Sequence, residues 1–364
     1  MPILAKTYYT IGLMSGSSLD GLDLAYCSFT FTDSWSFDLI HCKRASLGVW
    51  ENKLHSAVDL SKDDLNDLSI LFAHYLAQEV QEFIQENQIK NIDAVVSHGH
   101  TIFHNPDKGV TCQIGDGQTL ANQLDLKVIN NLRQADIDAG GQGAPIVPIG
   151  DLHLFKDYTI CLNLGGIANL SIKTKDGIVA FDVCTTNQVL NHYAHQKGFP
   201  YDDKGKMARK GKVNLSLLNK LNSLAYYQKM GPKSLDNGMA KLLIMEIDNS
   251  ETKLENALAT YVDHIAYLIG KDIANIANEY RMVLSEEVQL FVTGGGAFNT
   301  YLVARIQAYT KLKVVVPEEE LVNYKEAIVM AFIGVLKLKN EVNVLASVTG
   351  ANHDTSCGEV FEKG

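Results

Sequence analysis

A run of small and hydroxyl-bearing residues lies between Ile11 and Asp23, directly after an apolar segment. Small residues let the backbone approach a phosphate closely, and consecutive N–H groups can form a concave anion-binding site. Asp20 could order a Mg²⁺ ion, directly or through water. The run lacks the Gly-Lys-Ser/Thr ending of a Walker P-loop, and a plain β-turn would have a similar composition. The candidate phosphate-binding residues of this run are Gly12, Ser15, Gly16, Ser17, Ser18, Asp20 and Gly21.

Two later turns have the same physical character. One follows an apolar segment at residues 163–169, and the other lies between a predicted strand and a predicted helix at residues 294–299. Glycines there could let a nucleotide lie close to the backbone, or could only permit tight strand–helix packing. Three such turns in one chain favour a nucleotide as the ligand of at least two. Their candidate residues are Asn163, Gly165, Gly166, Asn169, Gly294, Gly295, Gly296 and Asn299.

Charged residues near strand ends are the candidates for acid–base chemistry and substrate contact. Asp182 lies near the end of a predicted strand, where a carboxylate can act as a general base, although such residues are often only solvated. Arg133 and Asp136 precede a glycine-rich segment. They could hydrogen-bond a polyol or a carboxylate ligand, or they could pair with each other.

Three histidines, His98, His100 and His104, invite a metal-binding interpretation. Their spacing matches no standard zinc signature, and no Cys/His cluster elsewhere complements them. We expect His98 to contact a substrate instead.

The elements that would position these residues occur twice along the chain. Apolar, alternating segments predict strands at 8–14, 22–31 and 36–44, and again at 159–164, 168–172 and 178–184. Helical periodicity follows at 64–86, where Leu65, Leu68, Leu71, Phe72, Leu76, Val80 and Phe83 share a face, and at 187–196 and 256–278. Short buried strands are expected at 93–97 and 288–292, and a last helix at 325–339, which could return to the first domain.

The length of 364 residues suits two domains rather than one core. Three strands followed by helices, repeated with a glycine-rich turn in each copy, predict an α/β protein of two actin/hexokinase-like (ribonuclease H-like) domains with a cleft between them. The expected N-terminal domain comprises residues 1–131 plus about 340–364, and the C-terminal domain comprises 132–339.

The composition excludes several classes of protein. A formal net charge of -10 disfavours binding to nucleic acid. The six cysteines form no Cys-x-x-Cys pair, which is typical of reduced, buried thiols. The N-terminus has no signal-peptide pattern, and the longest apolar run, 328–336, is too short to span a membrane. We therefore expect a cytoplasmic protein without membrane or nucleic-acid partners.

An ordered set of motifs resembles the anhydro-N-acetylmuramic acid kinases over nearly the whole chain. Residues 12–23 follow the opening motif Gly-x-Met-Ser-Gly-Thr-Ser-x-Asp-Gly-x-Asp, with serine at Ser17. Residues 97–101 match Ser-His-Gly-Gln-Thr, with His100 in place of glutamine. Residues 133–145 fit Arg-x-x-Asp and Gly-Gly-Gln-Gly-Ala-Pro, and 163–169 fit Asn-x-Gly-Gly-Ile-x-Asn. Tyr201-Asp202, Gly205, Lys233-Ser234 and 294–299 follow in order.

The resemblance implies an ATP- and Mg²⁺-dependent reaction in cell-wall recycling. Water would open the 1,6-anhydro bridge of anhydro-N-acetylmuramic acid, and the freed O6 would take the γ-phosphate, giving N-acetylmuramic acid 6-phosphate. By this resemblance Asp182 would activate the water. His98, Arg133, Asp136, Asn187 and Glu326 would bind the sugar. A homodimer is also implied.

Two segments depart from the family pattern. Val183-Cys184-Thr185-Thr186 replaces Thr-Gly-Pro-Gly, between Asp182 and Asn187, and Leu235-Asp236-Asn237 follows Lys233-Ser234 where glycine and glutamate are usual. Three alternatives therefore stay open: a kinase of the same fold for a different small sugar, a catalytically degenerate ATP-binding paralogue, and a non-enzymatic ATP-binding protein of the actin/chaperone type.

Overall fold

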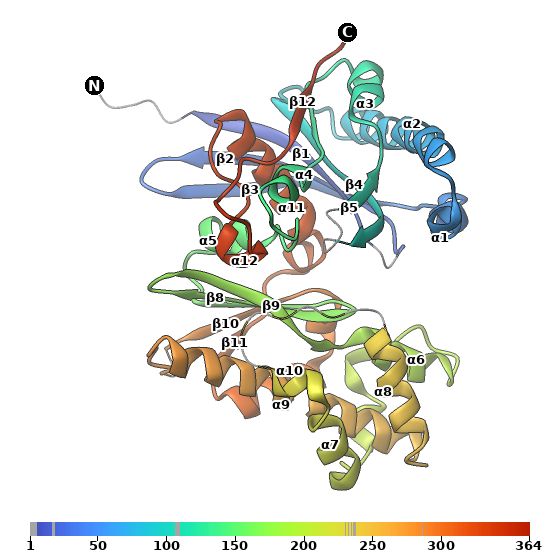
Figure 1. Cartoon of the computed structure of the whole chain (residues 1–364), viewed down its shortest axis with the longest axis vertical. Helices are drawn as coiled ribbons and strands as arrows, with labels where there is room; N and C mark the ends of the chain where they lie inside the picture. The colour runs from blue at the N-terminus through green and yellow to red at the C-terminus, as the bar shows by residue number, and fades with distance from the viewer. Residues whose placement is uncertain are drawn as a thin grey trace. The chain divides into compact units, whose positions relative to one another are not determined.

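The computed structural model describes residues 6–16, 19–105, 110–229, 231, 233, 235, 238–285 and 287–364. The chain divides into two compact units, residues 1–155 with 324–364, and residues 156–323. The expected boundaries lay after residues 131 and 339. In the structure residues 132–155 and 324–339 belong to the first unit, because the helices of both segments pack there (Figure 1).

The first unit is built on a mixed sheet of seven strands in the order β12-β6-β4-β1-β2-β3, with β5 paired to β4. β1, β2 and β3 are antiparallel, whereas β4 is parallel to β1 and to β6. The strands are β1 (Thr7–Ser15), β2 (Leu22–Phe31), β3 (Trp35–Ala45), β4 (Ala94–Asn105), β5 (Val110–Ile114), β6 (Val128–Asn130) and β12 (Glu359–Phe361).

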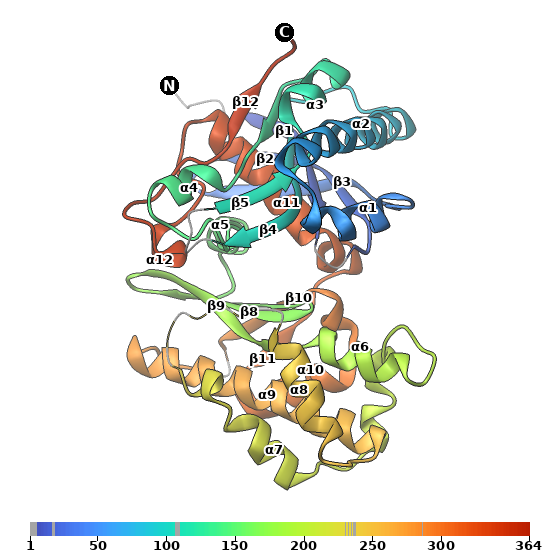
Figure 2. The same ribbon diagram turned by 45° about the vertical axis from the view of Figure 1, so that its right-hand side comes forward.

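Helices cover both faces of this sheet. Its longer helices are α2 (Lys62–Glu86) and α11 (Glu319–Leu338), and its shorter ones are α1 (Trp50–Ser56), α3 (Gly117–Leu124), α4 (Gln134–Asp138), α5 (Pro148–His153) and α12 (Ala346–Thr349). Ile11 and Leu13 of β1 join the core that α2 completes, whereas Gly12 between them faces α11. Because neighbouring residues of a strand point to opposite faces, α2 and α11 lie on opposite faces of the sheet (Figures 1 and 2).

The second unit repeats this strand order in a five-stranded sheet, β11-β10-β7-β8-β9. Again the first three strands, β7, β8 and β9, are antiparallel. β10 is then parallel to β7 on one side and to β11 on the other. The strands are β7 (Ile160–Leu164), β8 (Ile167–Thr174), β9 (Gly177–Thr185), β10 (Gln289–Thr293) and β11 (Lys313–Val315). The helices are α6 (Asn187–His195), α7 (Leu215–Asn222), α8 (Gly238–Asp248), α9 (Leu254–Glu279) and α10 (Thr300–Thr310). Both units thus contain three antiparallel strands followed by two parallel ones, in the order β3-β2-β1-β4-β6 in the first unit and β9-β8-β7-β10-β11 in the second, which confirms the predicted pair of actin-like domains.

The predicted elements differ from the observed ones in two informative places. β4 was expected to end near His98 but continues to Asn105, because it gains β5 as an antiparallel partner. Leu71 was expected on the buried face of α2, yet the residue is 53% exposed, because the helical period places it outside the stripe of buried residues.

Candidate functional site

The opening turn begins where β1 ends, and a buried histidine supports it. The pairing of β1 with β4 shifts register after Leu13, so that Ser15 pairs with His100. Ser15 Oγ and His100 Nδ1 lie 2.9 Å apart, and both side chains are buried. Burial lowers the pKa of His100 to about 4, so the ring is neutral at pH 7. His100 therefore holds the last residue before the turn, while Ser17 and Ser18 lie outside the described residues.

Packing accounts for two glycines of this turn. A Cβ at Gly12 would lie 2.0 Å from the carbonyl oxygen of Ala327, in α11. Gly21 has φ +150°, and a Cβ there would lie 2.8 Å from Cγ of Arg44. The phosphate contact of these glycines stays a prediction, because close packing already requires both to lack a side chain.

His98 and Arg133, 35 residues apart in sequence, are in direct contact. The Arg133 Nε–H donates to His98 Nε2 at 2.9 Å, and Arg133 Nη1 donates to the carbonyl of Gly143 at 2.6 Å. Since Nε2 accepts, we assign the proton of His98 to Nδ1, which lies 3.1 Å from the Gly99 carbonyl. Burial, with a smaller contribution from the Arg133 charge, lowers the pKa of His98 to about 3. A neutral histidine thus orients the guanidinium group.

Asp136 is completely buried and organises the glycine-rich loop. Its carboxylate accepts hydrogen bonds from the Gly143 N–H at 2.8 Å and the Thr349 hydroxyl at 2.7 Å. A Cβ at Gly141 would lie 2.2 Å from the same carboxylate, so this loop needs glycine there. Both oxygens are engaged inside the protein, and a contact of Asp136 with a substrate stays a prediction.

Glu326 lies on α11, close to charges of both signs. Burial raises the pKa of its carboxyl, and the Asp23 charge adds to this, whereas Lys325 and Arg133 oppose it. Lys325 forms a buried ion pair with Asp151 at 2.6 Å. The first unit therefore brings His98 into contact with Arg133, whose charge acts on Glu326, and the binding of a sugar by these residues stays a prediction.

In the second unit, Asp182 is held by two hydrogen-bond donors. Asn169 Nδ2 donates to Oδ1, and the Leu235 N–H donates to Oδ2 at 2.9 Å. Burial raises the pKa of Asp182, whereas these two hydrogen bonds lower it and only partly offset the effect. A fixed carboxylate with a raised pKa can accept a proton in a defined direction.

The segment after helix α7 also holds the backbone of Asp182, through a hydrogen bond that the sequence did not indicate. The Asp182 N–H donates to the Lys233 carbonyl at 2.9 Å. Lys233 Nζ in turn forms a buried ion pair with Asp272 of α9 at 2.8 Å, and lies above the rings of Phe181 and Tyr226. The motif containing Lys233 was visible in the sequence, but its partner lies 39 residues further along the chain.

The two later glycine turns meet at the ends of β7 and β10. Gly294 has φ +78°, and a Cβ there would lie 2.5 Å from Asn163 Oδ1. A Cβ at Gly296 would lie 2.7 Å from Cβ of Leu164, whereas one at Gly295 would have its nearest neighbour, in Asn187, at 3.9 Å. Gly295 is therefore the most open of the three.

Asparagines and a threonine complete this cluster of turns. Asn187 Nδ2 donates to the Leu164 carbonyl at 3.1 Å, and Asn299 caps α10 by accepting from the Leu302 N–H at 3.0 Å. The buried hydroxyl of Thr293 has no hydrogen-bond partner within the described ranges. The structure thus brings the predicted residues of both turns together in one unit, beside an unpaired buried polar atom.

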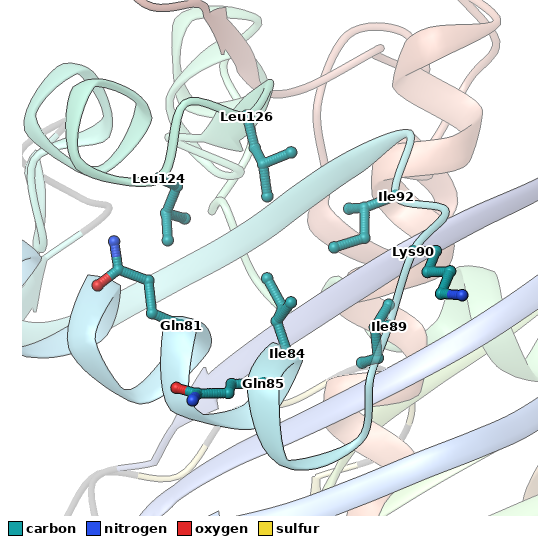
Figure 3. A pocket seen from close by; sticks show the side chains of 8 residues that line it. All are labelled: Gln81, Ile84, Gln85, Ile89, Lys90, Ile92, Leu124 and Leu126. Carbon is teal, nitrogen blue, oxygen red and sulfur yellow. The ribbon is translucent and has the colours of Figure 1, made fainter.

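The described pocket in Figure 3 involves other residues. It has a volume of about 360 Å³ and lies at the C-terminal end of α2, lined by Gln81, Ile84, Gln85, Ile89, Lys90, Ile92, Leu124 and Leu126. None of the predicted site residues lines it, so it does not identify the functional site.

Neither a metal cluster nor a membrane span is found in the described part of the chain. No three His, Cys, Asp or Glu side chains described there are grouped so that they could hold a metal ion. His104 instead pairs with Thr111 at 3.0 Å. No helix among the described residues is long and apolar enough to cross a membrane.

Comparisons with known proteins place the chain in a family. Residues 8–363 match the family model described as anhydro-N-acetylmuramic acid kinase. Anhydro-N-acetylmuramic acid kinases of Photobacterium profundum and Shewanella sediminis are 31% and 32% identical, covering 96% and 98% of this chain and 98% and 99% of the relatives. Component A of (R)-2-hydroxyglutaryl-CoA dehydratase from Acidaminococcus fermentans is a structural neighbour, with TM-score 0.42 and 13% identity, covering 89% of this chain and 96% of that one. Because the family model spans nearly all of the sequence, the chain belongs to the anhydro-N-acetylmuramic acid kinase family.

Proposed function

We propose that the protein is an anhydro-N-acetylmuramic acid kinase, which opens the 1,6-anhydro bridge of its sugar and phosphorylates O6. The family match over residues 8–363 is the observation that carries this proposal. The environment of Asp182 supports it, because a buried carboxylate with a raised pKa and a fixed orientation suits a general base.

In the proposed reaction Asp182 takes a proton from a water molecule as its oxygen attacks C1 of the sugar. The C1–O6 bond breaks, and O6 forms a bond to the γ-phosphorus while ADP leaves. Asp182 then releases the proton to solvent, so one water, one anhydro-sugar and one ATP give N-acetylmuramic acid 6-phosphate, ADP and one proton. A single carboxylate serves both bond changes, because the departing O6 is itself the nucleophile.

Arg133 and Glu326 are the proposed sugar-binding residues of the first unit, with His98 orienting Arg133. The guanidinium group can donate to oxygens of the sugar, and the Glu326 carboxyl can bond a hydroxyl. Because Nε donates to the neutral His98 ring and Nη1 donates to the Gly143 carbonyl, the Nη2 amino group is the part of the Arg133 guanidinium proposed to bind the ligand. Asn187 is also a proposed sugar-binding residue.

The glycine turns fit a nucleotide on structural grounds. Gly295 leaves open space where other residues would place a Cβ, and the buried hydroxyl of the nearby Thr293 has no partner among the described residues. We assign the phosphates to the turns at 163–169 and 294–299 and to the opening turn. Asp20 would help to hold Mg²⁺, which neutralises phosphate charge during phosphoryl transfer.

The test is a kinase assay with ATP, Mg²⁺ and the anhydro-sugar, comparing wild type with Asp182→Asn. We expect the variant to lose roughly 10²-fold or more in kcat, because general bases typically contribute that much. Product formation by the variant at a near-native rate would remove Asp182 from this role.

Isotope labelling separates the proposal from a kinase of the same fold that phosphorylates an ordinary hydroxyl. In ¹⁸O-water the proposed reaction places solvent oxygen at C1 of the product. The reaction must be quenched before spontaneous exchange at C1, with product incubated alone as the control. Unlabelled sugar phosphate would favour the ordinary kinase.

The proposal includes two expectations for the whole protein, a homodimer and a cytoplasmic location. Sedimentation equilibrium would check the first, since a monomer has a mass of 40.1 kDa. Cell fractionation would check the second.

A further inference from the structure

Two adjacent threonines follow Asp182 in the segment where the sequence departs from the family pattern. Thr185 ends β9, Thr186 precedes α6, and both side chains are fully buried. Their hydroxyl groups have different partners. The Thr186 hydroxyl donates to the carbonyl of Gly165 at 2.6 Å, whereas the Thr185 hydroxyl lies 2.6 Å from the Tyr261 hydroxyl in α9.

Thr186 belongs to a set of contacts that fixes one side of the Gly165–Gly166 turn. Its own N–H donates to the Gly166 carbonyl at 2.8 Å, and the Asn187 N–H donates to the Gly165 carbonyl at 3.3 Å. Asn187 Nδ2 holds the preceding carbonyl, that of Leu164, at 3.1 Å. Three consecutive carbonyl groups are thus bonded to the residues that begin α6.

Fixing a carbonyl also fixes the N–H of the same peptide plane, because the peptide group is planar. Glycine has the widest choice of backbone conformations, so a turn of two glycines depends on outside contacts for a single geometry. Gly166 is exposed, and its N–H donates to none of the described residues, so a ligand could accept a hydrogen bond from it. Its direction depends on the peptide between Gly165 and Gly166, whose carbonyl accepts from Thr186.

We infer that Thr186 is a positioning residue for ATP, because its hydroxyl holds the Gly165–Gly166 turn in the geometry that binds phosphate. This inference rests on the proposed function, which assigns the turn to the nucleotide. Thr186 touches no reacting group itself. It acts through the Gly165 carbonyl, so the last residue of the replaced family segment supports the nucleotide turn.

The experiment measures binding of Mg-ADP by calorimetry to the full-length protein, without sugar. Thr186→Val keeps the size of the side chain and removes the donor, so we expect roughly tenfold weaker ADP binding, from a lost hydrogen bond to the partly buried Gly165 carbonyl. Thr186→Ser keeps the hydroxyl and should bind ADP as the wild type does. In steady-state assays Thr186→Val should raise the KM for ATP more than it changes kcat.

Thr185→Val is the matched control, since it removes a neighbouring buried hydroxyl whose partner is Tyr261. It should lower the melting temperature about as much as Thr186→Val, yet leave ADP affinity unchanged. Wild-type affinity in Thr186→Val would overturn the inference, and so would equal losses of affinity in both valine variants. If Thr186→Val does not fold, Thr186→Ala takes its place with the same expected results. If the wild-type protein itself does not bind Mg-ADP, the proposed function fails together with the inference. If the wild type binds Mg-ADP and Thr186→Val binds it equally well, only the inference about Thr186 fails.

Discussion

At the scale of single residues, opposing influences act on the carboxyl group of Asp182. Burial raises its pKa from the ordinary value of 3.8, and the hydrogen bonds from Leu235 and Asn169 limit the rise. A base needs a pKa high enough to accept a proton and low enough to be ionised at working pH. The surroundings of Asp182 therefore set the pKa of its carboxyl group as well as the orientation of the carboxylate.

Removing one donor should shift the pH dependence in a known direction. The Asn169 side chain favours the charged carboxylate, so Asn169→Ala should raise the pKa of Asp182 further. Because Asp182 must be ionised to act as a base, the acid limb of the kcat–pH profile should move to higher pH. The measurement is kcat from acidic to neutral pH, with saturating substrates. An unmoved acid limb would show that another group controls it.

At the scale of secondary-structure elements, α11 and β1 are in unusually close contact. Gly12 of β1 faces the backbone of Ala327, and Gly334 of α11 leaves room for Val96 of β4. Glu326 directly precedes Ala327 on the same helix turn. The glycine contact therefore fixes the helix that carries a proposed sugar-binding residue.

Adding a methyl group at residue 12 should test this contact. Gly12→Ala would place Cβ against a backbone oxygen that cannot rotate away, so we expect the free energy of unfolding to fall by about 3 kcal/mol, at the upper end of overpacking effects. Urea denaturation measures this loss of stability. Titration with Mg-ADP tests the alternative, that Gly12 contacts the phosphates. Unchanged stability with lost ADP binding would instead make Gly12 a phosphate contact.

Much of the fold could be predicted from local patterns. β2 begins and ends where alternation indicated, and β1, β3 and α6 agree within one residue at each end, because apolar periodicity and turn residues are local signals. The continuation of β4 past His98 could not be predicted, since the strand there is partly exposed and is defined by its antiparallel pairing with β5, which leaves no apolar pattern in the sequence.

The candidate site was predictable in its residue types and not in its contacts. Glycine-rich turns and Asp182 stand out in sequence, whereas the ion pair of Lys233 with Asp272 joins distant segments. The loop held by Asp136 resembled a domain boundary, because its partner Thr349 lies more than 200 residues away. Long-range partners of this kind leave no local signal.

At the scale of the whole molecule, one strand order is built twice from different sequences. The second unit is continuous in sequence, whereas the first is completed only by the residues after 323. The second unit has its own core, in which Tyr227, Tyr261 and Leu162 are fully buried. Continuity and a separate core are the conditions under which a domain can fold alone.

We therefore expect residues 156–323, expressed alone, to fold. Thermal unfolding followed by circular dichroism should be cooperative, and amide proton resonances should be well dispersed. Residues 1–155 alone should not fold stably, because they lack α11, which covers one face of their sheet. A disordered 156–323 fragment would show that its core depends on the rest of the chain.

Gly12 and Gly295 should be conserved in evolution for different reasons. Gly12 is required by the contact between a strand and a helix, so selection for a folded protein retains it whether or not the protein is an enzyme. Gly295 has open space where its side chain would be, so selection for ligand binding is what would keep it. In a lineage that lost kinase activity, position 12 should stay glycine while position 295 drifts. The residues at these two positions of a relative should therefore distinguish an active kinase from a protein that has kept only the fold.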